Sequence, residues 1–157
     1  MVGGKQQDGL RTFTELKAWQ KARALRKAIS TLAKAFPAEE KFRLADQIIR
    51  SSRGPSANIA EGYGRFHEKD NAHFCRMASG SLNETMDHLT VAYDERYISA
   101  EVFKEHWGLA EETLRLLHGY IRYLRMPDRS SSSVSDPAEQ YGTGAEGDIF
   151  TDPPSDL

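Results

Sequence analysis

Histidines near acidic residues on the predicted helices are the first candidates for chemistry. A carboxylate-bridged di-iron site in a helical bundle needs Glu-x-x-His pairs that point inward from two helices. The chain has no such pair, and the nearest are Asp70 with His73 and Glu84 with His88. Both pairs fall outside or at the edge of the predicted apolar stripe, so the sequence predicts no metal site.

The other residues of catalytic type have plain structural explanations. His106 lies on an apolar helix face, where a single histidine is usually satisfied by one hydrogen bond. Cys75 has no base at a suitable spacing and fits a small buried side chain. Gly62 and Gly64 end a predicted helix instead of opening one after a strand, so they form no phosphate loop. We therefore predict no catalytic residue, no cofactor and no enzyme.

Basic side chains are the strongest functional signal. Phosphate binding needs many positive charges on one outward surface. The first predicted helix carries six bases, which only Glu15 opposes. The alternative is a solvated helix face with internal ion pairs. The candidate nucleic-acid-binding residues are Lys17, Lys21, Arg23, Arg26, Lys27, Lys34, Arg50, Arg53 and Arg65.

The segment Gln47–Arg65 carries Gly54-Pro55 in the middle of a predicted helix. Proline removes a backbone donor, so we expect a kink near Pro55. This helix also has a continuous polar row. The row is either structural, satisfying the backbone opened by Pro55, or a binding surface that faces the lumen or the outside of an oligomer, and the sequence leaves both readings open. Its members are Arg43, Gln47, Arg50, Asn58, Glu61 and Arg65.

Apolar residues at helical spacing predict an all-α bundle in one domain of residues 12–126. The predicted helices are 13–36, 38–63, 68–94 and 100–126. The connection around Phe66 is short, so the second and third helices are antiparallel neighbours. Counting outward from Phe66 sets Ser52 level with Gly80. Small residues around both positions should let the two backbones approach closely.

Some apolar side chains lie off the predicted core stripes. They occur at the start of the first helix, and the apolar arc of the last helix covers more than half of its circumference. Such an excess points to a second contact surface, most simply another subunit, although Trp19 could instead cover the bundle edge. The predicted interface residues are Phe13, Leu16, Trp19, Trp107, Leu109, Leu114, Leu116 and Tyr123.

Composition separates the bundle from its ends. The 157-residue chain has a net charge of −2, but residues 127–157 hold seven acids and one base, which leaves 20 bases and 16 acids elsewhere. We interpret 1–11 as a flexible lead and 127–157 as a disordered acidic tail, which could compete with nucleic acid for the basic faces. A single cysteine and no membrane-spanning or signal-peptide run favour a cytoplasmic protein without a membrane partner.

Three motifs, in this order and spacing, carry a family resemblance. They read LKAWQKA (16–22), FPAEEKFRLADQIIRSSRGPSANIAEGYGR (36–65) and ASGSLNET (78–85). They resemble the four-helix-bundle proteins encoded in bacterial 23S rRNA intervening sequences, over about residues 13–126. Gly54 departs from that family, whose members more often carry a small non-glycine residue there, such as valine or serine.

The resemblance implies an antiparallel up-down-up-down four-helix bundle and a ring-shaped homo-oligomer, typically a pentamer. The accessory proteins of diversity-generating retroelements look similar: they are pentameric barrels that bind nucleic acid and a reverse transcriptase. The implied function is a non-enzymatic, oligomeric accessory protein that binds nucleic acid, in the first place RNA. The alternative is an adaptor that docks a reverse transcriptase. A gene location inside an rRNA operon would favour RNA binding, and a neighbouring reverse transcriptase with template repeats would favour the adaptor.

Overall fold

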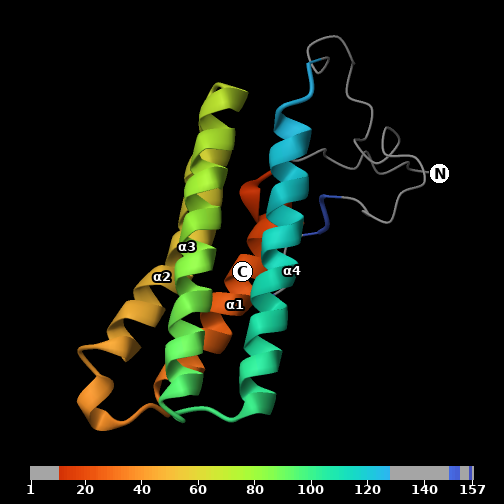
Figure 1. Ribbon diagram of the computed structural model, residues 1–157. Coiled ribbons are helices and arrows are strands. Elements are labelled where there is room, and N and C mark those ends of the chain that lie inside the picture. The colour runs from red at the N-terminus through yellow and green to blue at the C-terminus, as the bar shows by residue number, and fades with distance from the viewer. Residues whose placement is uncertain (1–10, 128–148, 153–155, 157) are drawn as a thin grey trace, which may run out of the picture.

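The computed structural model describes residues 11–127, 149–152 and 156. It contains four helices: α1 (Lys17–Ala33), α2 (Leu44–Tyr63), α3 (Glu68–Asp94) and α4 (Ala100–Leu124). The short 3₁₀ helices η1 (Phe13–Glu15) and η2 (Ala38–Glu40) precede α1 and α2. Successive helices alternate in direction, up and down (Figure 1). The predicted all-α class is confirmed, and the described residues contain no β-strand.

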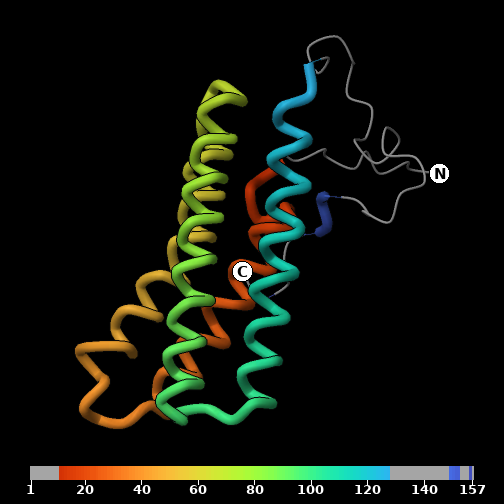
Figure 2. The backbone as a smooth tube through the Cα atoms, viewed as in Figure 1, coloured from red at the N-terminus to blue at the C-terminus, as the bar shows by residue number. Residues whose placement is uncertain are grey.

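The four helices enclose one core. Contacts run from α1 to α2, from α2 to α3, from α3 to α4 and from α4 back to α1, so each helix has two neighbours (Figure 2). Each helix turns an apolar stripe inward, since its apolar residues recur every three or four positions. The fully buried side chains come from all four helices and include Leu25, Ile29, Ile48, Ile59, Leu82, Leu89 and Leu117.

Small residues bring α2 and α3 together, as the sequence predicted. A Cβ atom on Gly54 would lie 2.4 Å from Ser81 Oγ and 2.7 Å from Ser81 Cβ, so the two backbones pass too close for a larger residue. Nearby, Thr85 Oγ1 donates a hydrogen bond of 2.9 Å to Ser51 Oγ. The predicted register is wrong by about one helical turn, because Gly54 lies opposite Ser81 and Ser51 opposite Thr85, so the pairing is centred near residue 68 and not on Phe66.

The second helix starts later than predicted, at Leu44 instead of residue 38. The carboxylate of Glu40 accepts a hydrogen bond of 3.0 Å from the Leu44 N–H and so caps α2. Tyr97 donates to the same carboxylate at 3.1 Å and holds it there. The chain turns between η2 and α2, and this leaves Phe42, which has the spacing of a core residue, 84% exposed.

The ends of the other helices differ less from the prediction. α3 spans the predicted range, and α4 ends two residues early, at Leu124. α1 begins at Lys17 because Leu16 adopts an extended backbone, with φ −68° and ψ 123°. Thr12 and Glu15 form a capping box around η1, just before this break.

Part of the predicted disordered tail packs against the bundle, which corrects that prediction. Ile149 and Phe150 are half-buried against the core, and Phe150 forms an antiparallel bridge with Leu16. We call residues 149–152 together with Asp156 the C-terminal segment. The rest of the predicted tail, 128–148, 153–155 and 157, lies outside the described residues, as does most of the predicted flexible lead.

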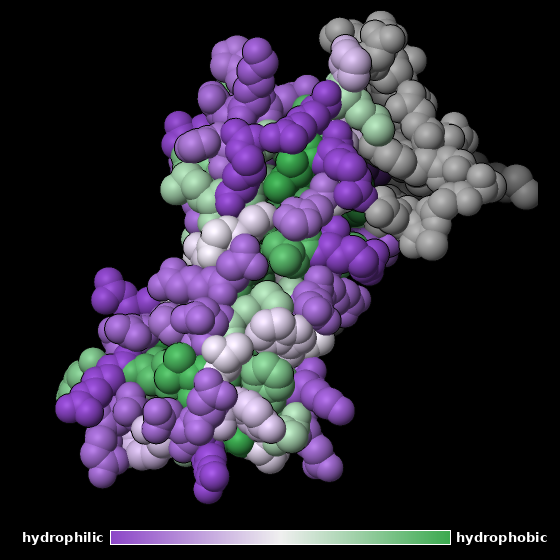
Figure 3. Space-filling view, in the orientation of Figure 1, coloured by the Kyte–Doolittle hydropathy of each residue, from purple (hydrophilic) through white to green (hydrophobic). Residues whose placement is uncertain are grey.

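Apolar side chains gather along the line where α3 and α4 meet, with hydrophilic side chains on both sides (Figure 3). An aromatic row joins these two helices. The ring centroids of Tyr93 and Phe103 are 5.1 Å apart, and those of Phe103 and Trp107 are 5.3 Å apart. In the part of the chain that is described, no helix is both long and apolar enough to cross a bilayer.

Candidate nucleic-acid interface

Three arginines from α1 and α2 share one face of the bundle. Burial lowers the pKa of Arg26, and the positive charges of Arg23 and Arg53 lower it further. The guanidinium groups of Arg23 and Arg53 are therefore close enough to repel the charge of Arg26. Arg26 is held by a hydrogen bond of 2.8 Å from Nη1 to Ser56 Oγ, and its Cζ lies 6.0 Å from the ring centroid of Trp19. Such a group of like charges favours the binding of an anion.

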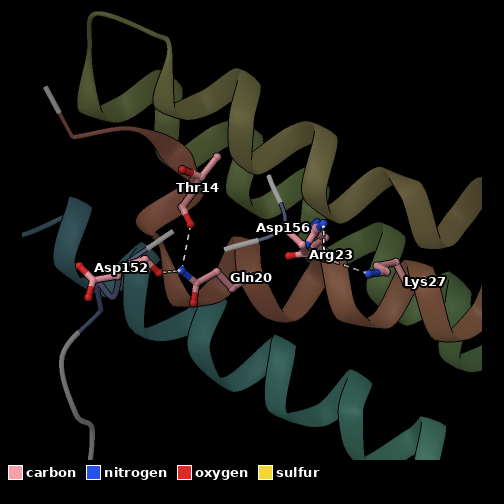
Figure 4. Close-up of polar contacts among 6 residues, drawn as sticks. All are labelled: Thr14, Gln20, Arg23, Lys27, Asp152 and Asp156. Carbon is pink, nitrogen blue, oxygen red and sulfur yellow. Dashed lines mark hydrogen bonds and ion pairs between the residues drawn. The ribbon is translucent and has the colours of Figure 1, made fainter. Parts of the chain in front are cut away.

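An acidic side chain of the C-terminal segment occupies this face. Arg23 donates from Nη1 to Asp156 Oδ1 at 3.1 Å and from Nη2 to Oδ2 at 3.2 Å, and Lys27 Nζ lies 3.6 Å from Oδ2 (Figure 4). The hydrogen bond from Arg23 keeps the pKa of Asp156 below its ordinary value. Guanidinium groups recognise phosphate by the same pair of parallel N–H···O bonds. We call Arg23, Arg26, Lys27 and Arg53 the basic cluster.

Two more of the predicted bases line a shallow groove between α1 and α4. Its volume is about 360 Å³, and its lining residues are Lys17, Gln20, Lys21, Glu112, Arg115, Leu116 and Thr151. Lys21 Nζ lies 3.1 Å from Glu112 Oε2, which neutralises part of the charge of this groove. A second groove of about 340 Å³ runs along α4 and is lined by Glu111, Leu114, Arg115, His118 and Arg122.

The remaining predicted bases are not part of the basic cluster. Arg50 and Arg65 each form an ion pair with an acid four residues earlier, Asp46 and Glu61. Lys34 is exposed just past the end of α1. A role of these three residues in binding stays a prediction.

The polar row of α2 includes structural contacts. Asn58 Nδ2 donates a hydrogen bond of 3.0 Å to the carbonyl of Gly54, which is a contact within α2 but not with the Ser51 carbonyl that Pro55 leaves without its usual donor. The ion pairs of Arg50 and Arg65 lie within the same helix or at its end, whereas Arg43 and Gln47 are exposed. The structural reading is therefore favoured for the middle and end of the row.

Sequence reasoning missed that α4 lines both grooves and that the C-terminal segment contacts the basic cluster. Arg115, His118 and Arg122 recur at helical spacing, a signal that would have placed them on one face. The apolar pair Ile149 and Phe150 stands in a polar tail, a signal that would have predicted a docked segment.

Two residues of catalytic type, His106 and Cys75, have structural hydrogen-bond partners. His106 Nδ1 lies 2.8 Å from the Val102 carbonyl oxygen, which confirms the expected hydrogen bond. Burial raises the pKa of Cys75 to about 12, although the charge of Arg76 opposes the shift, so the thiolate form is scarce at neutral pH. Within the described ranges, no group of three or more His, Cys, Asp or Glu side chains is placed to hold a metal ion.

The predicted subunit-interface residues fall into two groups. Leu16 and Trp19 are 0% and 5% exposed, which corrects the expectation that they lie off the core. Phe13 packs edge-on against Trp19, with ring centroids 5.3 Å apart. The others are half-buried against the core, and their role in an assembly stays a prediction: Trp107, Leu109, Leu114, Leu116 and Tyr123.

Comparison with known proteins agrees with the fold. The family model for the 23S rRNA-intervening sequence protein matches residues 14–119. The chain is also similar to a crystal structure of a protein with unknown function from the S23 ribosomal protein family of Bacteroides thetaiotaomicron VPI-5482. That pair has 26% sequence identity and a TM-score of 0.63, and the similarity covers 67% of this chain and 98% of the other. No curated protein matches the chain. The range matched by the family model includes the basic cluster and excludes the C-terminal segment.

Proposed function

The chain belongs to the 23S rRNA-intervening sequence protein family, and on that premise we propose that it is a non-enzymatic protein that binds RNA in the cytoplasm. The proposed contact surface is the basic cluster. The observation that carries this proposal is the anion already seated there, the Asp156 carboxylate held by both terminal nitrogens of Arg23. A phosphate group can accept the same two hydrogen bonds.

The composition of the cluster suits a phosphate backbone better than a small ligand. Arg23, Arg26 and Lys27 follow one face of α1, and Arg53 adds a charge from α2. No deep pocket is needed for such contacts, because phosphate oxygens can be reached from an outward surface. Arg26 is half-buried and already bonded to Ser56, so it contributes mainly through its charge.

We expect the affinity for a single-stranded RNA oligonucleotide to fall steeply with salt. Three to four phosphate contacts for each chain predict a slope of about −2 to −3 in a plot of log affinity against log salt concentration, because each contact releases counterions. Fluorescence anisotropy between 50 and 300 mM KCl, about the usual range for such titrations, measures this slope. A flat salt dependence, or no binding at the lowest salt, would contradict RNA binding through this cluster.

We also propose that the protein assembles into a homo-oligomer, typically a pentamer, as the family resemblance implies. The half-buried apolar side chains of α4, among them Trp107, Leu114 and Tyr123, support this proposal. An assembly would repeat the basic cluster and strengthen its field. Docking of a reverse transcriptase stays a prediction.

Light scattering is expected to give a mass several times the 17.7 kDa of one chain. Leu114→Glu should lower the mass to that of a monomer, because a carboxylate inside an apolar interface loses its hydration. Glu111→Gln is the matched control, since it changes a charge about one turn away and keeps the apolar surface. A monomeric wild-type protein at about 50 µM would contradict this proposal, because stable interfaces are populated at such concentrations.

A further inference from the structure

The C-terminal segment joins the bundle where the first helix starts. The Lys17 N–H donates to the Ile149 carbonyl at 2.9 Å, and the Thr151 N–H donates to the Glu15 carbonyl at 2.7 Å. These bonds flank Leu16, whose extended backbone leaves the Lys17 N–H and the Glu15 carbonyl accessible to the segment. The Lys17 N–H is one of the donors that a helix start leaves without an intrahelical partner. The segment therefore completes this end of α1.

Further contacts with the bundle guide the C-terminal segment along α1. Phe150 is half-buried, and its ring centroid lies 4.7 Å from the guanidinium carbon of Arg11. Gln20 Nε2 donates to the Asp152 carbonyl at 2.8 Å and to the Thr14 carbonyl at 2.9 Å (Figure 4). Asp152 thus lies beside Gln20, and Asp156 lies farther along α1, at Arg23 and Lys27.

We propose that the C-terminal segment is an internal competitor for the basic cluster, which a polyanion must displace in order to bind. This inference rests on the proposed function, since it concerns the same surface. The Asp156 carboxylate uses both Arg23 nitrogens that a phosphate would use, so the two ligands exclude each other. Because the segment belongs to the same chain, its effective concentration at the cluster is high even though its ion pairs are exposed.

The competition has a specific consequence for ligand choice. A single phosphate offers one contact and competes poorly against a tethered carboxylate. A polymer with many phosphates gains further contacts along α1 and α2 once Asp156 has left. The segment thus favours polyanions over free phosphate, and it lowers the apparent affinity without blocking the site.

One pair of substitutions separates this mechanism from a general charge effect. Asp156→Asn removes the carboxylate at the cluster and is expected to raise the affinity for single-stranded RNA about threefold at low salt. Asp152→Asn changes the net charge equally, but Gln20 contacts the backbone carbonyl of Asp152 and not its carboxylate. We expect this control to bind RNA like the wild type.

A second variant tests the anchor. Phe150→Ser combined with Asp156→Asn should raise the affinity about tenfold, because the segment loses its apolar contact as well as its ion pairs. Circular dichroism verifies the fold of each variant. Hydrogen exchange in the wild-type protein gives an independent readout, since bound RNA should speed exchange at the Lys17 and Thr151 amides.

The outcomes distinguish this inference from the proposed function. If RNA binds but Asp156→Asn behaves like Asp152→Asn, or both amides stay protected, the competitor is rejected and RNA binding stands. If inorganic polyphosphate binds and displaces the segment while RNA does not bind, the competitor is supported and the proposed RNA function fails. If neither probe binds any variant, both proposals are rejected.

Discussion

Reversing the charge at Arg23, Lys27 and Arg53 together is expected to lower RNA affinity at least about a hundredfold at low salt. Each side chain loses a charge-assisted contact worth about 1 kcal/mol or more, and each new carboxylate repels the phosphates. Arg26 is left unchanged, because its hydrogen bond to Ser56 links α1 to α2. The variant Arg23→Glu/Lys27→Glu/Arg53→Glu should therefore stay folded.

The matched control is Lys69→Glu/Arg76→Glu/Lys104→Glu, which makes the same change in net charge on exposed positions of α3 and α4. We expect its RNA affinity to fall only a fewfold, through the weaker general field. Anisotropy titrations at fixed salt compare the two variants, and circular dichroism checks their fold. Equal losses in both would show that RNA recognises overall charge and not the basic cluster.

Local sequence patterns predicted the helices well where local forces decide them. α3 has the predicted ends, since its apolar spacing is regular. The start of α2 could not be predicted in this way. It depends on Glu40, which caps Leu44 and is held by Tyr97, a residue 57 positions farther along the chain.

The candidate site, too, could be predicted only where the local sequence decides it. The richness of α1 in bases was visible in the sequence, but their grouping was not. Arg53 acts on the charge of Arg26 only because α1 packs against α2, and the contact of Arg26 with Ser56 spans 30 residues. The partner of Arg23 is more distant still, since Asp156 is 133 positions away in the chain. Composition alone predicts that such an acidic tail is solvated, because the many charges outweigh the apolar pair Ile149 and Phe150 that anchors the segment.

Gly62→Ala is expected to destabilise the bundle by about 1–3 kcal/mol, the range for overpacking a close helix contact. An added Cβ would lie 2.7 Å from Asn71 Oδ1, 2.9 Å from Phe74 Cβ and 3.0 Å from the Asn71 carbonyl oxygen. Asn71 cannot move aside freely, because its Nδ2 donates a buried hydrogen bond of 2.9 Å to Tyr120 on α4. Shortening Asn71 would not relieve the clash, since the carbonyl oxygen and Phe74 Cβ would stay in place.

Gly80→Ala is the opposite case and serves as the matched control. It makes the same chemical change within α3, but a Cβ there meets no atom within 4 Å. Alanine should then stabilise the helix by about 0.5–1 kcal/mol, because it loses less backbone entropy on folding than glycine. Urea unfolding at one fixed protein concentration compares the two variants and keeps any self-association constant. If the Gly62→Ala protein were as stable as the Gly80→Ala protein, α2 and α3 could not be packed tightly at Gly62, and the prediction would be wrong.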